Sequence, residues 1–121
     1  MANKTLLIVD DSRVARMMIA SLVLRQRPAW KITHAENGSE ALSTARKTSF
    51  DYISVDYNMP GMDGLMVAET LVREQPACRI VLLTANVQSA IEERALKLGV
   101  GYVGKPLTET SISALLDQFG D

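Results

Sequence analysis

The chain has 121 residues, 13 basic against 14 acidic side chains, and a formal net charge of −1. This length is typical of one domain, and a hydrophobic content of 47% predicts a folded core rather than a disordered chain. The near-neutral charge offers no overall attraction to nucleic acid or an anionic membrane, and the single Cys78 excludes a disulfide framework. The N-terminal apolar run is too short for a signal peptide or a membrane span. We therefore expect one cytoplasmic domain over residues 1–121, with no output domain.

Short apolar runs alternate with segments of helical period along the whole chain. The runs typical of strands are residues 6–9, 31–35, 52–55, 80–83 and 102–103. The first helical segment follows Ser12, a typical N-cap residue, and ends before Pro28. Its predicted core-facing stripe consists of Val14, Met17, Met18, Ser21 and Leu22.

The other four helical segments carry their own start and stop signals. Ser39 is predicted to cap the second helix, and Asp63 is predicted to cap the third, which ends before Pro76. Ser89 and Glu92 have the spacing of a capping box at the start of the fourth helix, which ends at Gly99. The fifth begins at Thr108 and presents four apolar residues to the core, namely Ile112, Leu115, Leu116 and Phe119.

Five strand-like runs, each followed by a helix, predict a (βα)5 α/β domain. Runs such as residues 6–9 are apolar on both faces, as expected for a parallel sheet that is covered on both sides. Right-handed crossovers make the fold doubly wound, and ligands of such folds bind beyond the carboxyl ends of the strands.

Polar side chains stand at four of these predicted strand ends. Asp10 and Asp11 follow the first run, Asp56 the third, Thr84 the fourth and Lys105 the fifth. Three neighbouring carboxylates repel one another unless cations lie among them. Lys105 supplies one positive charge, and Mg2+ is the divalent ion that best suits a few oxygen ligands with retained water. A carboxylate beside Mg2+ and lysine can accept a phosphoryl group, and Asp56 is the central candidate.

The sequence resembles a known family in four motifs. LLIVDDS, SVDYNMPGMDG, IVLLTA and YVGKP are similar, in order and spacing, to the receiver domains of two-component response regulators. The resemblance covers essentially the whole chain and favours the single-domain, chemotaxis-type receivers. It implies the flavodoxin-like strand order 2-1-3-4-5, which the chemotaxis regulator of this family exemplifies.

The resemblance also implies a role for each site residue. Asp56 is the phosphoacceptor, and Thr84 and Lys105 hold phosphoryl oxygens. The ligands of Mg2+ are Asp56, Asp11, Asp10 mainly through water, and the backbone carbonyl of Asn58. Asn58 and Asn86 occupy positions that modulate dephosphorylation by water.

Signalling is expected to follow a local change of charge. A phosphoryl group adds roughly −1.5 to −2 charges, so it attracts Thr84 and Lys105. The resemblance implies that the ring of Tyr102 then turns inward and remodels the surface formed by residues 87–98, 101–103 and 108–119.

The leading hypothesis is a phosphoacceptor protein rather than an enzyme with a separate substrate. It receives phosphate from a sensor histidine kinase or histidine phosphotransfer protein and binds a downstream target, as a monomer or weak dimer, in a pathway such as chemotaxis. A phosphate shuttle or sink in a phosphorelay is the alternative. An FMN-binding flavodoxin is disfavoured because Asp10 and Asp11 replace its phosphate loop, and an aspartyl phosphatase because Asp10-Asp11-Ser12 lacks its D-x-D motif. A pseudo-receiver is disfavoured because every motif position is filled.

Overall fold

The computed structural model describes residues 3–85 and 88–121 and contains a five-stranded parallel sheet in the order β2-β1-β3-β4-β5. Strands and helices alternate along the chain, as predicted. Their bounds are β1 Thr5–Val9, α1 Arg13–Gln26, β2 Lys31–Ala35, α2 Gly38–Lys47, β3 Tyr52–Asp56, α3 Gly64–Glu74, β4 Arg79–Thr84, α4 Ser89–Leu98, β5 Gly101–Gly104 and α5 Glu109–Phe119. The doubly wound α/β fold and its strand order are therefore confirmed.

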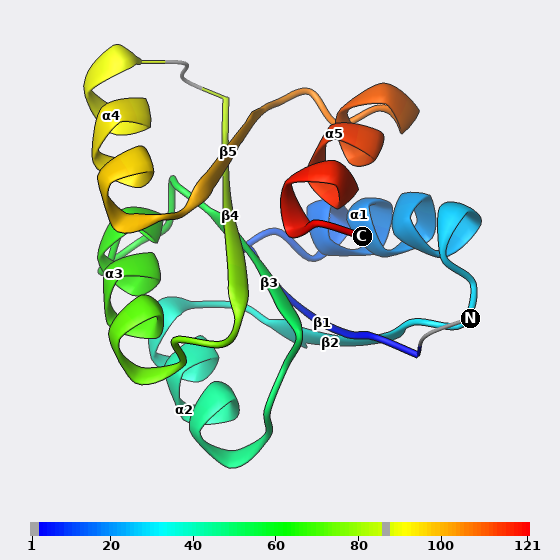
Figure 1. Ribbon diagram of the computed structural model, residues 1–121, viewed down its shortest axis with the longest axis horizontal. Helices are drawn as coiled ribbons and strands as arrows, with labels where there is room; N and C mark the ends of the chain where they lie inside the picture. The colour runs from blue at the N-terminus through cyan, green and yellow to red at the C-terminus, as the bar shows by residue number, and fades with distance from the viewer. Residues whose placement is uncertain (1–2, 86–87) are drawn as a thin grey trace.

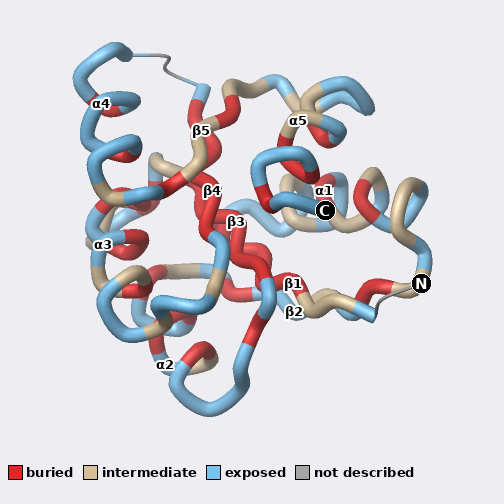
Figure 2. The backbone as a smooth tube through the Cα atoms, viewed as in Figure 1, coloured by how far each residue is buried: buried red, intermediate tan, exposed pale blue. Residues whose placement is uncertain are grey.

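The sheet forms the middle of three layers (Figure 1). Helices α1 and α5 cover one face, while α2, α3 and α4 cover the other. Alternate residues of β1 enter the two cores: Leu7 and Val9 pack with α2 and α3, whereas Leu6 and Ile8 pack with α1 and α5. This two-sided burial explains why the strand is apolar at successive positions. Strands β1, β3 and β4 are buried along most of their length, whereas the edge strand β2 is largely exposed, as are the outer faces of the helices (Figure 2).

Most of the predicted core stripe of α1 is wrong, since only Leu22 of its five residues packs against the core, where it is partly buried. Val14, Met17 and Met18 are exposed by 75%, 56% and 51%, whereas Ile19 and Val23 are almost completely buried. Apolar residues surround much of this helix, so two stripes of helical period fit the same sequence. The packing of Ile19 and Val23 against the sheet selects one stripe and leaves the two methionines in solvent.

Two predicted helix caps are also wrong. Asn37, and not Ser39, caps α2, because its side-chain oxygen accepts a hydrogen bond from the backbone N–H of Glu40 at 2.8 Å. Helix α4 starts one residue earlier than a Ser89 cap would place it, with Gln88 at the N-cap and no side-chain cap bond. The caps predicted at Ser12, Asp63 and Thr108 are present; Thr108 forms a capping box with Ser111.

None of the helices in the described part of the chain combines the length and the apolar character that a membrane crossing requires.

Candidate functional site

The end of β1 delivers two acidic residues to one edge of the sheet. The Asp10 side chain is buried, and its Oδ1 accepts a hydrogen bond from the backbone N–H of Ser12 at 2.9 Å. Nη1 of Arg16 donates to the backbone carbonyl of Asp10 at 2.7 Å. Asp11, the next residue, is exposed. The turn therefore holds Asp10 inside the protein and turns Asp11 toward solvent.

Asp56 is the last residue of β3, and only 5% of it is exposed. Helix α3 begins at Gly64, and this residue lies close to the backbone of Asp56. A Cβ at Gly64 would lie 2.2 Å from the backbone oxygen of Asp56, far inside van der Waals contact. The Gly64 N–H donates to the Tyr57 carbonyl at 2.8 Å, which closes the loop between β3 and α3. Glycine at position 64 thus lets the loop fold back directly beside Asp56.

The ends of β4 and β5 supply a hydroxyl and an ammonium group. Thr84 is the last residue of β4 and is completely buried. The backbone N–H of Lys105 donates to the Thr84 carbonyl at 2.8 Å, which places the lysine immediately after the β4–β5 pairing. Its Nζ lies 2.9 Å from Oδ1 of Asp56 and 3.3 Å from Oδ2 of Asp10. The peptide bond between Lys105 and Pro106 is cis.

The site carries more negative than positive charge. One carboxylate oxygen from each of Asp10, Asp11 and Asp56 lies within 4.8 Å of the others. Burial raises the pKa of Asp56, and the charges of Asp10 and Asp11 raise it further, although the hydrogen bond from Lys105 partly offsets this rise. Burial alone would lower the pKa of Lys105, but its hydrogen bond to Asp56 and the neighbouring carboxylates more than compensate and raise it. One lysine therefore serves two carboxylates, and a further cation would relieve the remaining repulsion.

The donor atoms of this cluster suit a hard divalent cation. All three side chains offer oxygen, and no histidine or cysteine takes part in the cluster among the described residues. Such a set fits Mg2+ or Ca2+ better than zinc or copper. A cavity of about 630 Å³ adjoins the cluster at Asp11 and is lined by residues 36–39 and 60–62. A ligand bound to the cation would therefore have open space beside it.

The remaining predicted site residues lie around this cluster. Asn58 is exposed in the loop after Asp56, while Asn86 lies outside the described residues. Tyr102 lies on β5, and its hydroxyl oxygen accepts a hydrogen bond from the backbone N–H of Gln88 at 3.3 Å. The contact of Arg16 with the Asp10 carbonyl was not predicted from the sequence. The only available signal was that Arg16 follows the N-cap Ser12 by one helical turn.

Comparisons with known proteins agree with this arrangement. Residues 6–117 match the response regulator receiver domain family. The chain is 39% identical over 107 residues to a probable transcriptional regulatory protein, TcrX of Mycobacterium tuberculosis, covering 86% of this chain and 44% of that protein. It is 30% identical over 119 residues to the chemotaxis protein CheY-3 of Vibrio cholerae, covering 96% of this chain and 91% of that protein. This chain therefore spans less than half the length of the transcriptional regulator.

A solved structure is similar in both sequence and fold. A response regulator protein from Burkholderia pseudomallei, described with a phosphorylated aspartic acid, calcium ion and citrate, is 32% identical with a TM-score of 0.78. The match covers 93% of this chain and 65% of that one.

Proposed function

The chain belongs to the response regulator receiver domain family, and on that premise we propose that it accepts a phosphoryl group on Asp56. One observation carries this proposal: the nearly buried Asp56 lies beside Lys105 and two further carboxylates at one edge of the sheet. The phosphorylated aspartic acid described for the Burkholderia protein supports the same chemistry for this chain.

In the proposed transfer, a carboxylate oxygen of Asp56 attacks the phosphorus atom of a phosphohistidine. The phosphorus–nitrogen bond breaks, its electron pair returns to the imidazole, and Asp56 becomes an acyl phosphate. Lys105 stays beside the reacting carboxylate and compensates charge on the phosphoryl oxygens. The chain is thus a phosphoacceptor that catalyses only its own phosphorylation and dephosphorylation.

We propose Mg2+ as the cation that completes the site. Asp56, Asp11, Asp10 mainly through water, and the backbone carbonyl of Asn58 would hold it, and it would neutralise charge on the phosphoryl oxygens when bound. The close approach of three carboxylates supports this assignment, because their repulsion is costly without a cation. Asn58 and Asn86 remain our candidates for tuning the later attack of water.

The proposed output follows from movement of Thr84 toward the phosphoryl group. Thr84 is fully buried at the end of β4 and pairs with Gly104, two residues after Tyr102 on the neighbouring strand. Residues two apart on a strand share one face of the sheet, so we propose that a shift of the Thr84 side chain alters the packing of the Tyr102 ring. We expect the ring to turn inward and to remodel the surface of residues 87–98, 101–103 and 108–119, of which residue 87 lies outside the described part of the chain. A downstream target protein would bind this surface.

We propose that the phosphodonor binds next to Asp56, on a surface that includes helix α1. A histidine kinase or histidine phosphotransfer protein must bring its phosphohistidine to Asp56, so its surface must contact the residues around that edge. Val14, Met17 and Met18 form an exposed apolar patch on α1, directly after the acidic turn. This patch begins three residues after Asp11 in the sequence and can pack against an apolar surface of the donor.

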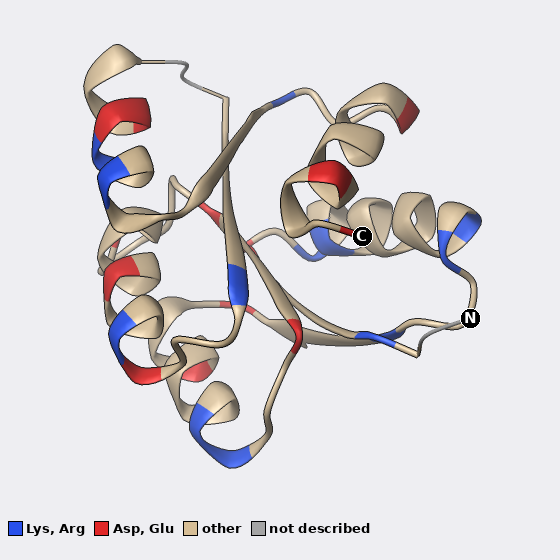
Figure 3. Ribbon diagram, viewed as in Figure 1, with Lys and Arg blue, Asp and Glu red and all other residues tan. Residues whose placement is uncertain are grey.

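Partners of other classes are not favoured. In Figure 3, α2, α3 and α4 carry both basic and acidic residues, whereas α1 carries only basic and α5 only acidic ones. The formal net charge of −1 gives no overall attraction to nucleic acid or an anionic membrane. We therefore propose a cytoplasmic receiver that acts through protein partners, as a monomer or weak dimer. The match over most of the chemotaxis protein's length supports signalling without an output domain in residues 1–121.

The experiment is incubation with acetyl phosphate and Mg2+, followed by intact-mass measurement. We expect one phosphoryl group on the wild type and none on Asp56→Asn. Asp117→Asn is the matched control, because Asp117 is an exposed carboxylate on α5, outside the cluster. Equal phosphorylation of wild type and Asp56→Asn would overturn the proposal.

A further inference from the structure

Strand β5 forms an open edge of the sheet, with β4 as its neighbour. In a parallel pair, the N–H and C=O of one residue point to the same side, and this side alternates along the strand. The register pairs Gly101 with Val81 and Val103 with Leu83, and the Lys105 N–H bonds to the Thr84 carbonyl. The polar backbone groups of Tyr102 therefore face outward, where an added strand would bind.

The side chain of Gln118 occupies that position. Its Oε1 accepts a hydrogen bond from the Tyr102 N–H at 2.6 Å, and its Nε2 donates to the Tyr102 carbonyl at 2.9 Å. These are the two bonds that a neighbouring strand would form. A Cβ at Gly101 would lie 2.3 Å from Oε1 of Gln118, so glycine leaves the space that the carboxamide needs.

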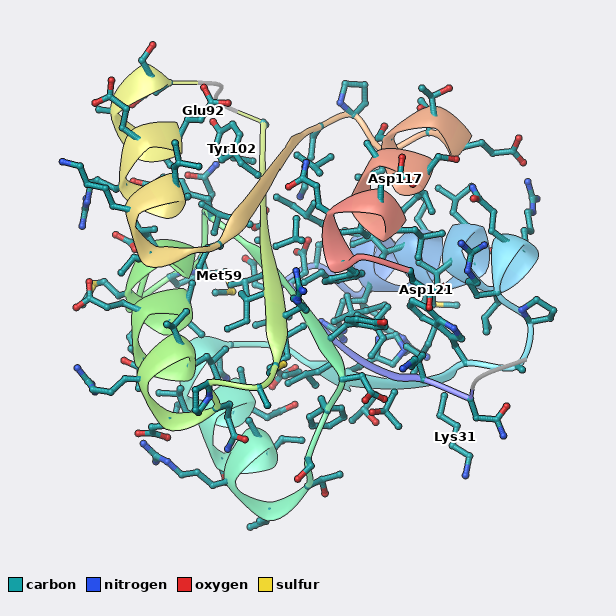
Figure 4. The ribbon with its side chains drawn as sticks, viewed as in Figure 1. Lys31, Met59, Glu92, Tyr102, Asp117 and Asp121 are labelled. Carbon is teal, nitrogen blue, oxygen red and sulfur yellow. The ribbon has the colours of Figure 1, made fainter. Side chains whose placement is uncertain are left out.

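The ring of Tyr102 makes a separate connection to α4. Its hydroxyl oxygen accepts a hydrogen bond from the Gln88 N–H, at a helix start that lacks a side-chain cap. Figure 4 shows Tyr102 near Glu92, in the first turn of α4, while Asp117 marks α5, the helix that carries Gln118. Tyr102 thus connects to α4 through its side chain and to α5 through its backbone.

We propose that Gln118 is a positioning residue that anchors the backbone of Tyr102 to α5, so that switching moves the ring and not the strand. This proposal rests on the proposed function, because it specifies which part of the structure moves when Asp56 is phosphorylated. With the backbone fixed, inward rotation of the ring removes the hydrogen bond at the start of α4. The change is then directed to α4 and to the adjoining 320 Å³ cavity, which Glu92, Leu96 and Tyr102 help to line.

The two hydrogen bonds between Gln118 and the Tyr102 backbone, which we call the anchor, lead to a prediction for the unphosphorylated protein alone. We expect Gln118→Leu, which keeps the bulk but removes both bonds, to increase hydrogen exchange of the Tyr102 amide by about five-fold or more. Gln118→Glu should retain most of the protection, because a carboxylate still accepts from the N–H. The control is Asp117→Asn, the preceding exposed position on α5. Unchanged exchange in Gln118→Leu would overturn the anchor.

The second measurement follows the switch by NMR with acetyl phosphate and Mg2+. Intact mass should show that wild type and Gln118→Leu are phosphorylated equally. Phosphorylation should shift the Tyr102 ring signals in both proteins, but shift the Tyr102 amide further in Gln118→Leu than in wild type. Equal amide shifts would refute the positioning role. Failure of the wild type to gain a phosphoryl group would instead refute the proposed function, while the exchange result would still decide whether the anchor exists.

Discussion

Replacing Lys105 by methionine tests the charge balance of the site. Lys105→Met keeps a chain of similar length but removes the ammonium between Asp56 and Asp10, at 2.9 and 3.3 Å. Coulomb's law with an effective dielectric constant of about 20 gives attractions of roughly 6 and 5 kcal/mol at these distances. Desolvation of the ammonium offsets part of this attraction, since only 23% of the side chain is exposed.

The net loss of stability is smaller than the sum of the attractions. Breaking a buried ion pair by removing one partner costs about 3–5 kcal/mol. We expect the lower end, about 3 kcal/mol, because part of the lysine reaches solvent; for a domain of this size it corresponds to about 10 °C in the melting temperature. The assay is thermal unfolding at pH 7 in Mg2+-free buffer. Lys97→Met is the control, because Lys97 is exposed on α4.

The pH dependence gives the same prediction a second test. Without Lys105, the already raised pKa of Asp56 rises further, because the lysine is what lowers it. A carboxyl group whose pKa is raised in the folded state stabilises that state only while it is protonated, and this contribution is lost as the pH rises through the folded-state pKa. The difference between wild type and Lys105→Met should therefore be largest at pH 7 and should shrink toward pH 4. A variant that melts within about 2 °C of the wild type at pH 7 would refute the reasoning.

Four further predictions concern the same edge of the sheet. Asp56→Asn should melt above the wild type at pH 7 without Mg2+, because the raised pKa of Asp56 means that its ionised form opposes folding. This difference in melting temperature should vanish as the pH falls toward 3.8, the pKa of the carboxyl group in the unfolded chain. A higher melting temperature of the variant at pH 3 would contradict this prediction. Mg2+ at one hundred times its dissociation constant should stabilise the wild type by about 2.7 kcal/mol in urea unfolding. Asp11→Asn should require more Mg2+ for the same effect, and an unchanged titration would exclude Asp11 as a ligand. Gly64→Ala should lower the free energy of unfolding in urea by about 1–3 kcal/mol and slow phosphorylation by acetyl phosphate, because its methyl group must push the Asp56 backbone away. A variant as stable as the wild type would contradict this prediction, because it would show that the loop accommodates the methyl group without cost.

The candidate site could be located from the sequence because parallel strands bring their carboxyl ends together. That rule alone predicts that Asp10, Asp11, Asp56, Thr84 and Lys105 converge, and the structure places them at one edge. The strand order required the family resemblance, since the order in which strands pair depends on tertiary packing and not on local periodicity.

The missed features depend on contacts between distant segments. The buried face of α1 was misassigned because Met17 and Met18 fit a helical stripe as well as Ile19 and Val23 do. Only packing on the sheet distinguishes the two stripes. Gln118 and Tyr102 are 16 residues apart on different elements, so no local pattern indicates their paired hydrogen bonds.

The most direct test of the account is to locate the phosphoryl group on the chain. After incubation with acetyl phosphate and Mg2+, borohydride reduces an aspartyl phosphate to homoserine, which peptide mass mapping can identify. The account predicts homoserine at position 56 and at no other carboxylate. Homoserine at Asp10 or Asp11, or an unmodified Asp56 in phosphorylated protein, would contradict it.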